Sequence, residues 1–275
     1  MPEGPEIRRE ADAIMAAVAG KPLVALELNL PALRVWHDEL LDSGITRVDT
    51  HGKAMLTRFA CGLTLYSHNQ LYGRWVVRRR GQATPTNRAL RVGLHTAEWS
   101  ALLYSATEVQ VLDDAALAAH PFLRRLGPDV LDSSLDWRRI AARLQSPAFR
   151  GRALGALYLD QGFIAGIGNY LRSEILHYAG LHPARRPQDL STRETNALAR
   201  QTLAVSLRAY RAKGVTNDAA RVARLKAAGN PYSAFRFAVF ERAGEACYGC
   251  GSSVQKISMS SRRLYFCATC QPPVA

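Results

Sequence analysis

Hydrophobic positions near the start of the chain recur with helical spacing. Ile7, Ala11 and Ile14 fall three or four residues apart, which places them on one face of a helix. Pro5 suits the first turn of such a helix, and Gly20 suits its end. The pattern therefore predicts one amphipathic helix from Pro5 to about Val18.

From Leu23 to about Leu112 the pattern changes to short runs separated by turn residues. These runs predict two hairpins, one from Ala54–Phe59 and Leu63–His68 and the other from Leu90–Leu94 and Ser100–Tyr104. Cys61 stands between the first two runs, and we expect it to be a small buried hydrophobic residue. A strand-rich region with a leading helix indicates a β-sandwich with flanking helices.

Beyond this region the chain becomes helical. Gly127-Pro128-Asp129 and the polar residues after it, to Ser134, predict a linker. Four helices are then expected, at Trp137–Leu144, Arg152–Gln161, Tyr170–Ala179 and Thr192–Tyr210. Lys213–Ser233 is less regular because glycine and proline interrupt it, and Phe235–Phe240 alternates like a strand.

The net charge of the chain indicates the chemical class of its binding partner. Its 275 residues are 48% hydrophobic, which is ample for a core, and its formal net charge is +13. Such a charge indicates a polyanionic partner. The excess of Arg over Lys is also typical of a GC-rich genome, so the net charge is the better indicator. No run of about 18 apolar residues and no apolar signal segment occurs, so we expect a cytoplasmic protein with no membrane association.

Four of the five cysteines lie near the end of the chain. Cys247 and Cys250 are two residues apart, as are Cys267 and Cys270, and sixteen residues separate the pairs. This spacing is typical of a four-thiolate, structural zinc site, whereas a cytosolic compartment disfavours two disulfides. The intervening segment has room for a hairpin whose turn would present arginines to DNA, although a metal-stabilised protein-binding module has the same pattern.

The first residues carry a possible nucleophile. Initiator Met1 is readily removed before a small residue, and Pro2 would then offer a secondary amine beside the carboxylate of Glu3. A partly neutral amine can attack a sugar C1′ and form an iminium intermediate. Taken alone, the segment favours the simpler interpretation of an N-terminal cap for the helix that follows.

Several motifs together resemble the formamidopyrimidine-DNA glycosylase/endonuclease VIII family, and within it the bacterial endonuclease VIII branch. They cover nearly the whole chain, in the family's order, and end with the four cysteines. The motifs are Pro2-Glu3-Gly4-Pro5-Glu6, His51-Gly52-Lys53-Ala54, residues 64–73, His120-Pro121-Phe122-Leu123, Arg125, residues 127–131 and residues 166–172.

The resemblance implies a bifunctional glycosylase and AP lyase of DNA base excision repair. Pro2 would be the nucleophile and Glu3 would transfer protons. Lys53 would be a further catalytic acid or a DNA-contacting cation, where the residues alone suggest a solvated turn lysine. Arg262, on the zinc hairpin, would bind the lesion's phosphates and assist the second elimination, so that β,δ-elimination leaves phosphate ends.

The resemblance also assigns residues to DNA binding. Gln70, Leu71 and Tyr72 would form a wedge that fills the gap left by an everted nucleotide, whereas the residues alone also allow a tip folded on the core. Asn169 would bind DNA and cap the helix after Gly166-Ile167-Gly168. Arg125 would bind the backbone. Arg124 and Arg172 are weaker candidates, since most arginines lie on solvated faces.

We therefore expect an α+β multidomain protein. Residues 1–126 would form the catalytic β-sandwich, 127–134 a linker, 135–234 a helix–two-turn–helix domain and 235–275 a zinc-finger hairpin. The protein would act as a monomer on damaged double-stranded DNA of the bacterial nucleoid and remove oxidised pyrimidines. A preference for 8-oxoguanine and formamidopyrimidines, favoured by the long 213–233 segment, and a non-catalytic damage-binding zinc protein are the alternatives.

Overall fold

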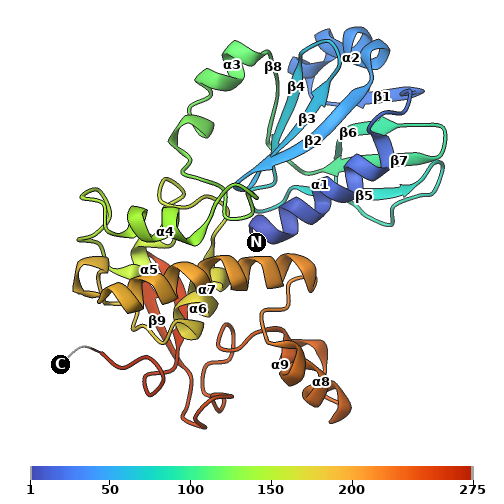
Figure 1. Ribbon diagram of the computed structural model, residues 1–275. Helices are drawn as coiled ribbons and strands as arrows, with labels where there is room; N and C mark the ends of the chain where they lie inside the picture. The colour runs from blue at the N-terminus through green and yellow to red at the C-terminus, as the bar shows by residue number, and fades with distance from the viewer. Residues whose placement is uncertain (1, 274–275) are drawn as a thin grey trace. The chain divides into compact units, whose positions relative to one another are not determined.

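The computed structural model describes residues 2–273, which divide into two compact units (Figure 1). Unit 1 contains Pro2 and Glu6–Arg125, and unit 2 contains Glu3–Pro5 and the chain from Leu126 onward. Residues 127–134 lie in unit 2, where Val130 is buried in the core and its N–H donates to the carbonyl of Ala165. The domain boundaries expected from the sequence stay a prediction.

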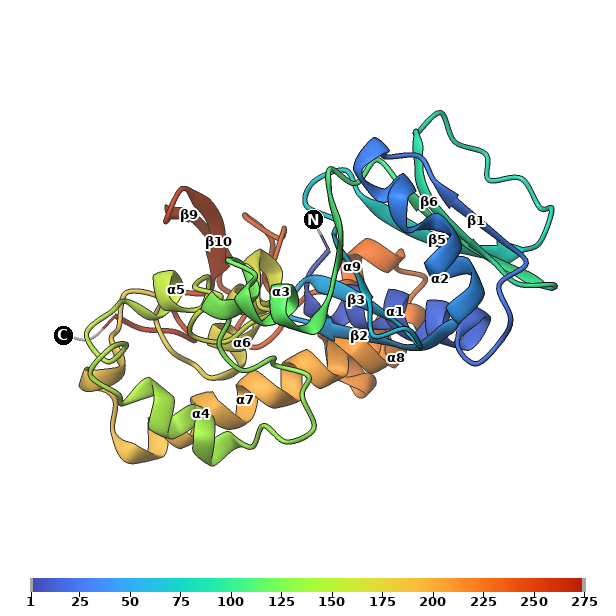
Figure 2. The same cartoon turned by 90° about the horizontal axis from the view of Figure 1, so that it is seen from above.

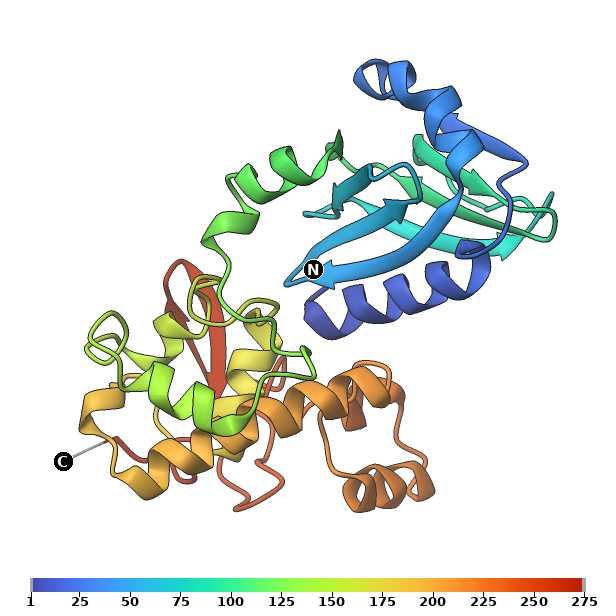
Figure 3. The same ribbon diagram turned by 45° about the horizontal axis from the view of Figure 1, so that its top comes forward.

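Unit 1 is a sandwich of two antiparallel four-stranded sheets with helices around it (Figure 3). The strand orders are β1-β6-β7-β5 and β2-β3-β4-β8. The elements are α1 (Gly4–Val18), β1 (Ala25–Leu28), η1 (Pro31–Trp36), α2 (His37–Ser43), β2 (Ile45–His51), β3 (Ala54–Phe59), β4 (Thr64–His68), β5 (Arg74–Arg79), β6 (Leu90–His95), β7 (Trp99–Tyr104), β8 (Glu108–Leu112), α3 (Asp114–Ala119) and η2 (Leu123–Arg125).

The first half of the chain folds as its pattern predicts. Ile7, Ala11 and Ile14 of α1 are buried in one core with the inner faces of both sheets. The expected hairpins are the antiparallel pairs β3–β4 and β6–β7. The predicted β-sandwich with flanking helices is therefore confirmed, and α1 lies along it (Figure 3).

The prediction for Cys61 is wrong, because its side chain is exposed. β3 ends at Phe59, whose N–H donates to the carbonyl of Leu63, so the four residues between the strands form a tight turn. Gly62 supplies the left-handed conformation of this turn, with φ of 85°. Cys61 thus points outward from a turn and is not part of a strand.

Unit 2 is built from helices and one hairpin (Figure 2). Its elements are α4 (Trp137–Leu144), α5 (Leu154–Leu157), α6 (Asn169–Tyr178), η3 (Pro187–Asp189), α7 (Thr192–Arg211), α8 (Ala219–Ala227), α9 (Tyr232–Arg236), β9 (Gln255–Met259) and β10 (Arg262–Phe266). The long α7 packs beside α4 and α6, and the β9–β10 hairpin rests on α6 (Figure 2). The helices expected at α4, α6 and α7 are confirmed.

Two helical predictions need correction. The helix expected at Arg152–Gln161 is a single turn, α5, because Asp160 pairs with Arg152 and accepts from the N–H of Gly162, which bends the chain away. The irregular 213–233 segment contains a nine-residue helix, α8, capped by the Asp218 carboxylate and followed by Gly229 at φ of 74°. Its glycines delimit this helix and do not abolish it.

The strand expected at Phe235–Phe240 is also wrong. The N–H groups of Ala238, Val239 and Phe240 all donate to the carboxylate of Glu174, at 2.8 to 2.9 Å. Glu174 is fully buried on α6 and also accepts from the hydroxyl of Thr216. A buried carboxylate has therefore taken the donors that a neighbouring strand would need.

Within residues 2–273, the structure contains no helix with the length and hydropathy needed to cross a membrane.

Candidate functional site

The carboxylate of Glu3 lies at the N-terminus of α6. It accepts hydrogen bonds from the N–H groups of Gly168 at 2.7 Å, Tyr170 at 2.8 Å and Leu171 at 3.2 Å. Only 3% of Glu3 is exposed. Three amide donors and the positive end of the helix dipole stabilise an ionised carboxylate here.

Glycine is required where this carboxylate meets the helix. A Cβ at Gly168 would lie 2.5 Å from Cδ of Glu3, far inside van der Waals contact. A Cβ at Gly4 would come within 3.1 Å of the backbone of Gly166, and the Gly4 N–H donates to the Gly166 carbonyl. The small residues of the 166–168 segment thus allow the N-terminal segment to dock against it.

The helix cap expected from Asn169 is wrong. Gly168 is the N-cap residue, no cap side chain bonds to the helix, and Glu3 takes the amide donors instead. Asn169 is the first residue of α6, and its Oδ1 accepts from Arg172 at 3.2 Å. The N-terminus of α6 is therefore occupied by a carboxylate, so its amides are not the phosphate site expected from the sequence.

Arg172 is fully buried, which contradicts the alternative of an arginine on a solvated face. Its guanidinium donates to the carbonyls of Gly155, Met259, Arg262 and Arg263 as well as to Asn169. Burial lowers its pKa to about 10, the charge of Glu3 opposes that change, and the charge of Arg262 adds to it. Arg172 thus joins the start of α6 to the turn of the hairpin.

Arg262 begins β10 directly after the hairpin turn. Ser260 and Ser261 adopt left-handed conformations, with φ of 55° and 57°, as in the tight turns that suit antiparallel strands. The side chain of Arg262 is exposed. The predicted hairpin with arginines at its tip is confirmed, and the carbonyl of Arg262 is held by Arg172.

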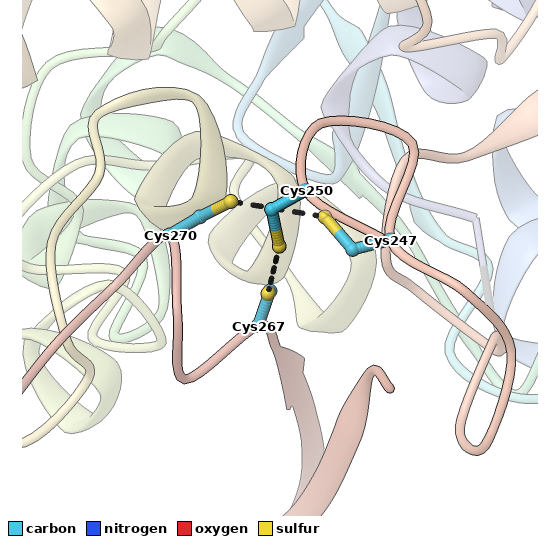
Figure 4. A group of neighbouring side chains, drawn as sticks. All are labelled: Cys247, Cys250, Cys267 and Cys270. Carbon is cyan, nitrogen blue, oxygen red and sulfur yellow. Dashed lines mark hydrogen bonds between the residues drawn. The ribbon is translucent and has the colours of Figure 1, made fainter. Parts of the chain in front are cut away.

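The four cysteines of the C-terminal segment converge (Figure 4). Their Sγ atoms all lie within 4.8 Å of one another, with 3.8 Å between Cys247 and Cys270 and 3.4 Å between Cys250 and Cys267. These separations exclude disulfides, whose sulfurs are about 2.05 Å apart. Four sulfurs around one tetrahedral ion with bonds of about 2.3 Å would lie roughly 3.8 Å apart, so the donor set fits a metal ion.

Lys53 and the predicted wedge residues gather at one end of the β2-β3-β4-β8 sheet. The β3–β4 register pairs Ala54 with His68, so Lys53 and Asn69 lie at the same end of these strands. Lys53 is half-buried, and its charge contributes to a lowered pKa of His68, which is caused chiefly by burial and opposed by Glu108. Lys53 therefore lies half-buried in the turn between β2 and β3, and its catalytic role stays a prediction.

The tip of the loop after β4 is exposed. Leu71 is 67% and Tyr72 68% exposed, so the alternative of a tip folded on the core is excluded. Gln70 turns back, because its Nε2 donates to Glu108 at 2.7 Å and its Oε1 accepts from Thr107 at 3.3 Å. Two large apolar side chains therefore stand out from an anchored turn, which we call the wedge loop (69–73).

Pro2 and Arg125 complete the predicted set. Pro2 is half-buried and lies two residues before the start of α1, while Met1 lies outside the described residues. Arg125, at the end of η2, is exposed, and its Nε donates to the carbonyl of Pro121 at 3.0 Å. The structure places Glu3, Asn169 and Arg262 around α6, and Lys53 with the wedge loop at the sheet end.

Two carboxylates with structural contacts, the fully buried Glu174 and the half-buried Glu10, were not predicted from the sequence. Glu174 fixes the segment that leads into the cysteines, and Glu10 of α1 bonds to Asn69 in the wedge loop at 2.9 Å. A signal for both was present. Glu10 lies three residues after Ile7 and four before Ile14, on the flank of the apolar stripe, and Glu174 is enclosed in an apolar helix.

The chain matches two families in sequence. Residues 1–114 match the formamidopyrimidine-DNA glycosylase N-terminal domain, and residues 126–220 match the formamidopyrimidine-DNA glycosylase H2TH domain. It is 46% identical over 271 residues to an endonuclease 8 of Escherichia coli O17:K52:H18, covering 98% of this chain and 100% of the relative. It is 45% identical over 271 residues to an endonuclease 8 of Enterobacter sp. strain 638, again covering 98% of this chain and 100% of the relative.

Solved structures share the fold. A complex of wild-type Lactococcus lactis Fpg (MutM) with DNA containing N7-benzyl-Fapy-dG has a TM-score of 0.79 at 19% identity, covering 99% of this chain and 100% of that one. A complex of the same protein with DNA containing an abasic site has a TM-score of 0.79 at 18% identity, covering 98% and 100%.

Proposed function

The chain belongs to the formamidopyrimidine-DNA glycosylase family and is a DNA glycosylase and AP lyase of base excision repair, and we propose that it removes oxidised pyrimidines from duplex DNA through a covalent bond to Pro2. The observation that carries this proposal is the Glu3 carboxylate, buried at the N-terminus of α6 and one peptide bond from Pro2. A fixed anion beside a secondary amine suits the formation of a cationic intermediate.

After loss of Met1, the Pro2 nitrogen attacks C1′ of the damaged nucleotide and loses its proton. The bond from C1′ to the base breaks, and the base leaves with the electron pair and takes up a proton. The sugar ring then opens as O4′ leaves C1′ and takes a proton, which gives an iminium ion between Pro2 and C1′. The charge of Glu3 stabilises this cation. Three amide donors hold this carboxylate in its ionised form, so Glu3 serves at this step as a fixed anion with no proton of its own to donate.

The iminium ion withdraws electrons from C2′, so a C2′ proton is removed and the 3′ phosphate leaves. A second elimination expels the 5′ phosphate, and water then releases the sugar fragment from Pro2. Both single-strand ends carry phosphates. Lys53 and Arg262 are the cations proposed to assist these steps, Lys53 by proton transfer and Arg262 by binding the leaving phosphates.

The wedge loop accounts for how a base becomes accessible. Leu71 and Tyr72, both about two-thirds exposed, would enter the stack and offset the few kcal/mol that unstacking costs. Arg125, exposed at the end of η2, and Asn169, at the start of α6, are the proposed contacts to the DNA backbone. Phosphate contacts of this kind make binding steeply dependent on salt.

The four cysteines would hold one structural zinc ion. Its chemistry when bound is to cross-link the two cysteine pairs in a closed site, since a four-thiolate ion leaves no position for substrate. This cross-link fixes both ends of the segment that carries Arg262. We further infer that the protein acts as a monomer, because one chain supplies every residue that the reaction uses.

The choice of lesion is tested by excision from matched duplexes that contain thymine glycol or 8-oxoguanine opposite cytosine. The Gln70-Leu71-Tyr72 tip supports faster release of thymine glycol, and phosphates should be found at both ends of the nick. Faster release of 8-oxoguanine would favour the guanine-acting branch, for which the observed α8 helix within the 213–233 segment is the supporting feature.

A further inference from the structure

Glu10 is a carboxylate of α1 that no step of the reaction uses. Its Oε2 accepts a hydrogen bond from Nδ2 of Asn69 at 2.9 Å, across 59 residues of chain. Glu10 is half-buried and Asn69 is only 5% exposed. Removing a carboxylate from water costs free energy, and most carboxylates therefore stay exposed. The partial burial of Glu10 against Asn69 indicates a structural or functional role.

Asn69 is the base of the wedge loop. Its carbonyl accepts from the N–H of Gly73 at 2.7 Å, which closes the turn around Gln70, Leu71 and Tyr72. A Cβ at Gly73 would lie 2.7 Å from the Asn69 backbone, so the two ends of the loop are in the closest approach that a glycine allows. Whatever fixes Asn69 therefore fixes the direction in which the tip stands.

The loop is held at two points that differ in exposure. On the outer side, Gln70 bonds to Glu108 and Thr107 in exposed contacts. On the inner side, the Glu10–Asn69 bond ties the loop to α1. Because α1 begins two residues after Pro2, this inner bond links the loop proposed to evert the base to the helix that follows the proposed nucleophile.

We propose that Glu10 is a positioning residue that fixes the base of the wedge loop through Asn69 and so determines how well Leu71 and Tyr72 enter the duplex. The inference rests on the proposed function, because it presumes that the loop is inserted into DNA. It adds a specificity-determining contact beneath the loop, away from the DNA and from the reacting atoms.

The charges around Glu10 make this anchor sensitive to pH. The pKa of Glu10 is raised to about 7, chiefly by burial and also by Glu6 one turn earlier on α1, while Asn69 and Arg74 of β5 oppose the change. Above that pH the ionised carboxylate bonds strongly to Asn69 and attracts Arg74, and below it both interactions weaken. Insertion of the wedge should therefore increase as the pH rises through about 7.

Three variants test the proposal. Glu10→Ala removes the bond, Glu10→Gln keeps an acceptor for Asn69 but cannot ionise, and Asp12→Asn makes the same change of charge on α1 away from the loop. Asp12 pairs with Arg8 on the helix surface. Each is bound to a duplex with a tetrahydrofuran abasic analogue opposite 2-aminopurine, whose fluorescence reports unstacking without chemistry. Excision from the duplex and lyase activity on a preformed AP site are measured beside it.

We expect Glu10→Ala to lose about tenfold in duplex excision while AP-site cleavage changes little, because the bond to a charged acceptor is lost but the nucleophile is intact. Glu10→Gln should behave at every pH as wild type does below pH 7, with the same weaker excision and with fluorescence that does not vary with pH. Asp12→Asn should match wild type in both. Equal fluorescence and excision in wild type and Glu10→Ala, or an unchanged pH profile in Glu10→Gln, overturns the inference. No fluorescence increase in wild type would instead refute the wedge itself.

Discussion

Substituting Gly168 by alanine tests the position of the Glu3 carboxylate without altering its charge. The added Cβ would stand 2.5 Å from Cδ and Oε1 of Glu3 and 2.8 Å from Cγ. Ordinary contact begins near 3.4 Å, so the carboxylate must retreat by about 1 Å. Gly168 has φ of −136°, a value that alanine also adopts, so the strain is steric and not conformational.

A displacement of about 1 Å removes one or two of the three amide bonds to Glu3. Charge-assisted bonds contribute about 1.5–3 kcal/mol each, so the free energy of unfolding should fall by about 3 kcal/mol. Misplacement by this distance reduces catalysis roughly 100-fold. We expect that loss in both base excision and AP-site cleavage, measured under single-turnover conditions, with thermal unfolding followed by circular dichroism.

Gly151→Ala is the matched control. Its Cβ would lie 3.7 Å from Oε1 of Gln188, an ordinary contact, so neither stability nor rate should change by more than a small factor. If Gly168→Ala retained full activity, the fixed Glu3 carboxylate would not be part of the catalytic arrangement. Equal losses in both variants would show that any alanine in unit 2 is harmful.

Three further outcomes are expected. Truncating Leu71 and Tyr72 to alanine should slow excision from duplex DNA at least tenfold and spare cleavage of a preformed AP site; equal losses on both substrates would contradict a wedge role. Removing the metal with a chelator, or substituting Cys250 by serine, should abolish the second elimination before the first. Atomic absorption should detect about one zinc ion released per chain by the chelator. Zinc-free protein with full activity would refute the assignment. Burial raises the pKa of Glu10 to about 7, so between pH 4.5 and about 7 the folded protein binds a proton that the unfolded chain has lost. The free energy of unfolding therefore falls as the pH rises through that window. In Glu10→Gln that fall in the free energy of unfolding should be smaller, by at most about 3 kcal/mol. Identical pH profiles of wild type and Glu10→Gln in chemical denaturation would refute this role of Glu10.

The sequence predicted the elements whose stability is local. The apolar stripe of α1, the hairpins around Cys61-Gly62 and the paired cysteines all act over a few residues, and each appears as expected. The failures are at residues whose partners lie far away in the chain. Asn169 reads as a helix cap because nothing nearby shows that Glu3, more than 160 residues earlier, takes its place.

Glu174 and Arg172 illustrate the same limit. Both lie in the short stretch from Tyr170 to Leu176, where a periodic pattern suggests ordinary surface charges. In the fold they are fully buried, because Glu174 accepts the amides of the 238–240 segment and Arg172 donates to four backbone carbonyls. Charged residues within an apolar helix are the sequence signal for such buried networks, although the partners cannot be named from it.

The proposed reaction requires the Pro2 nitrogen to bond covalently to the sugar of the damaged nucleotide. The most direct measurement is reduction with borohydride during reaction with a thymine glycol duplex, followed by digestion and mass spectrometry of the adduct. The account predicts a stable protein–DNA adduct whose only modified residue is an N-terminal Pro2 that has lost Met1. An adduct on Lys53, or active protein that retains Met1, would contradict it.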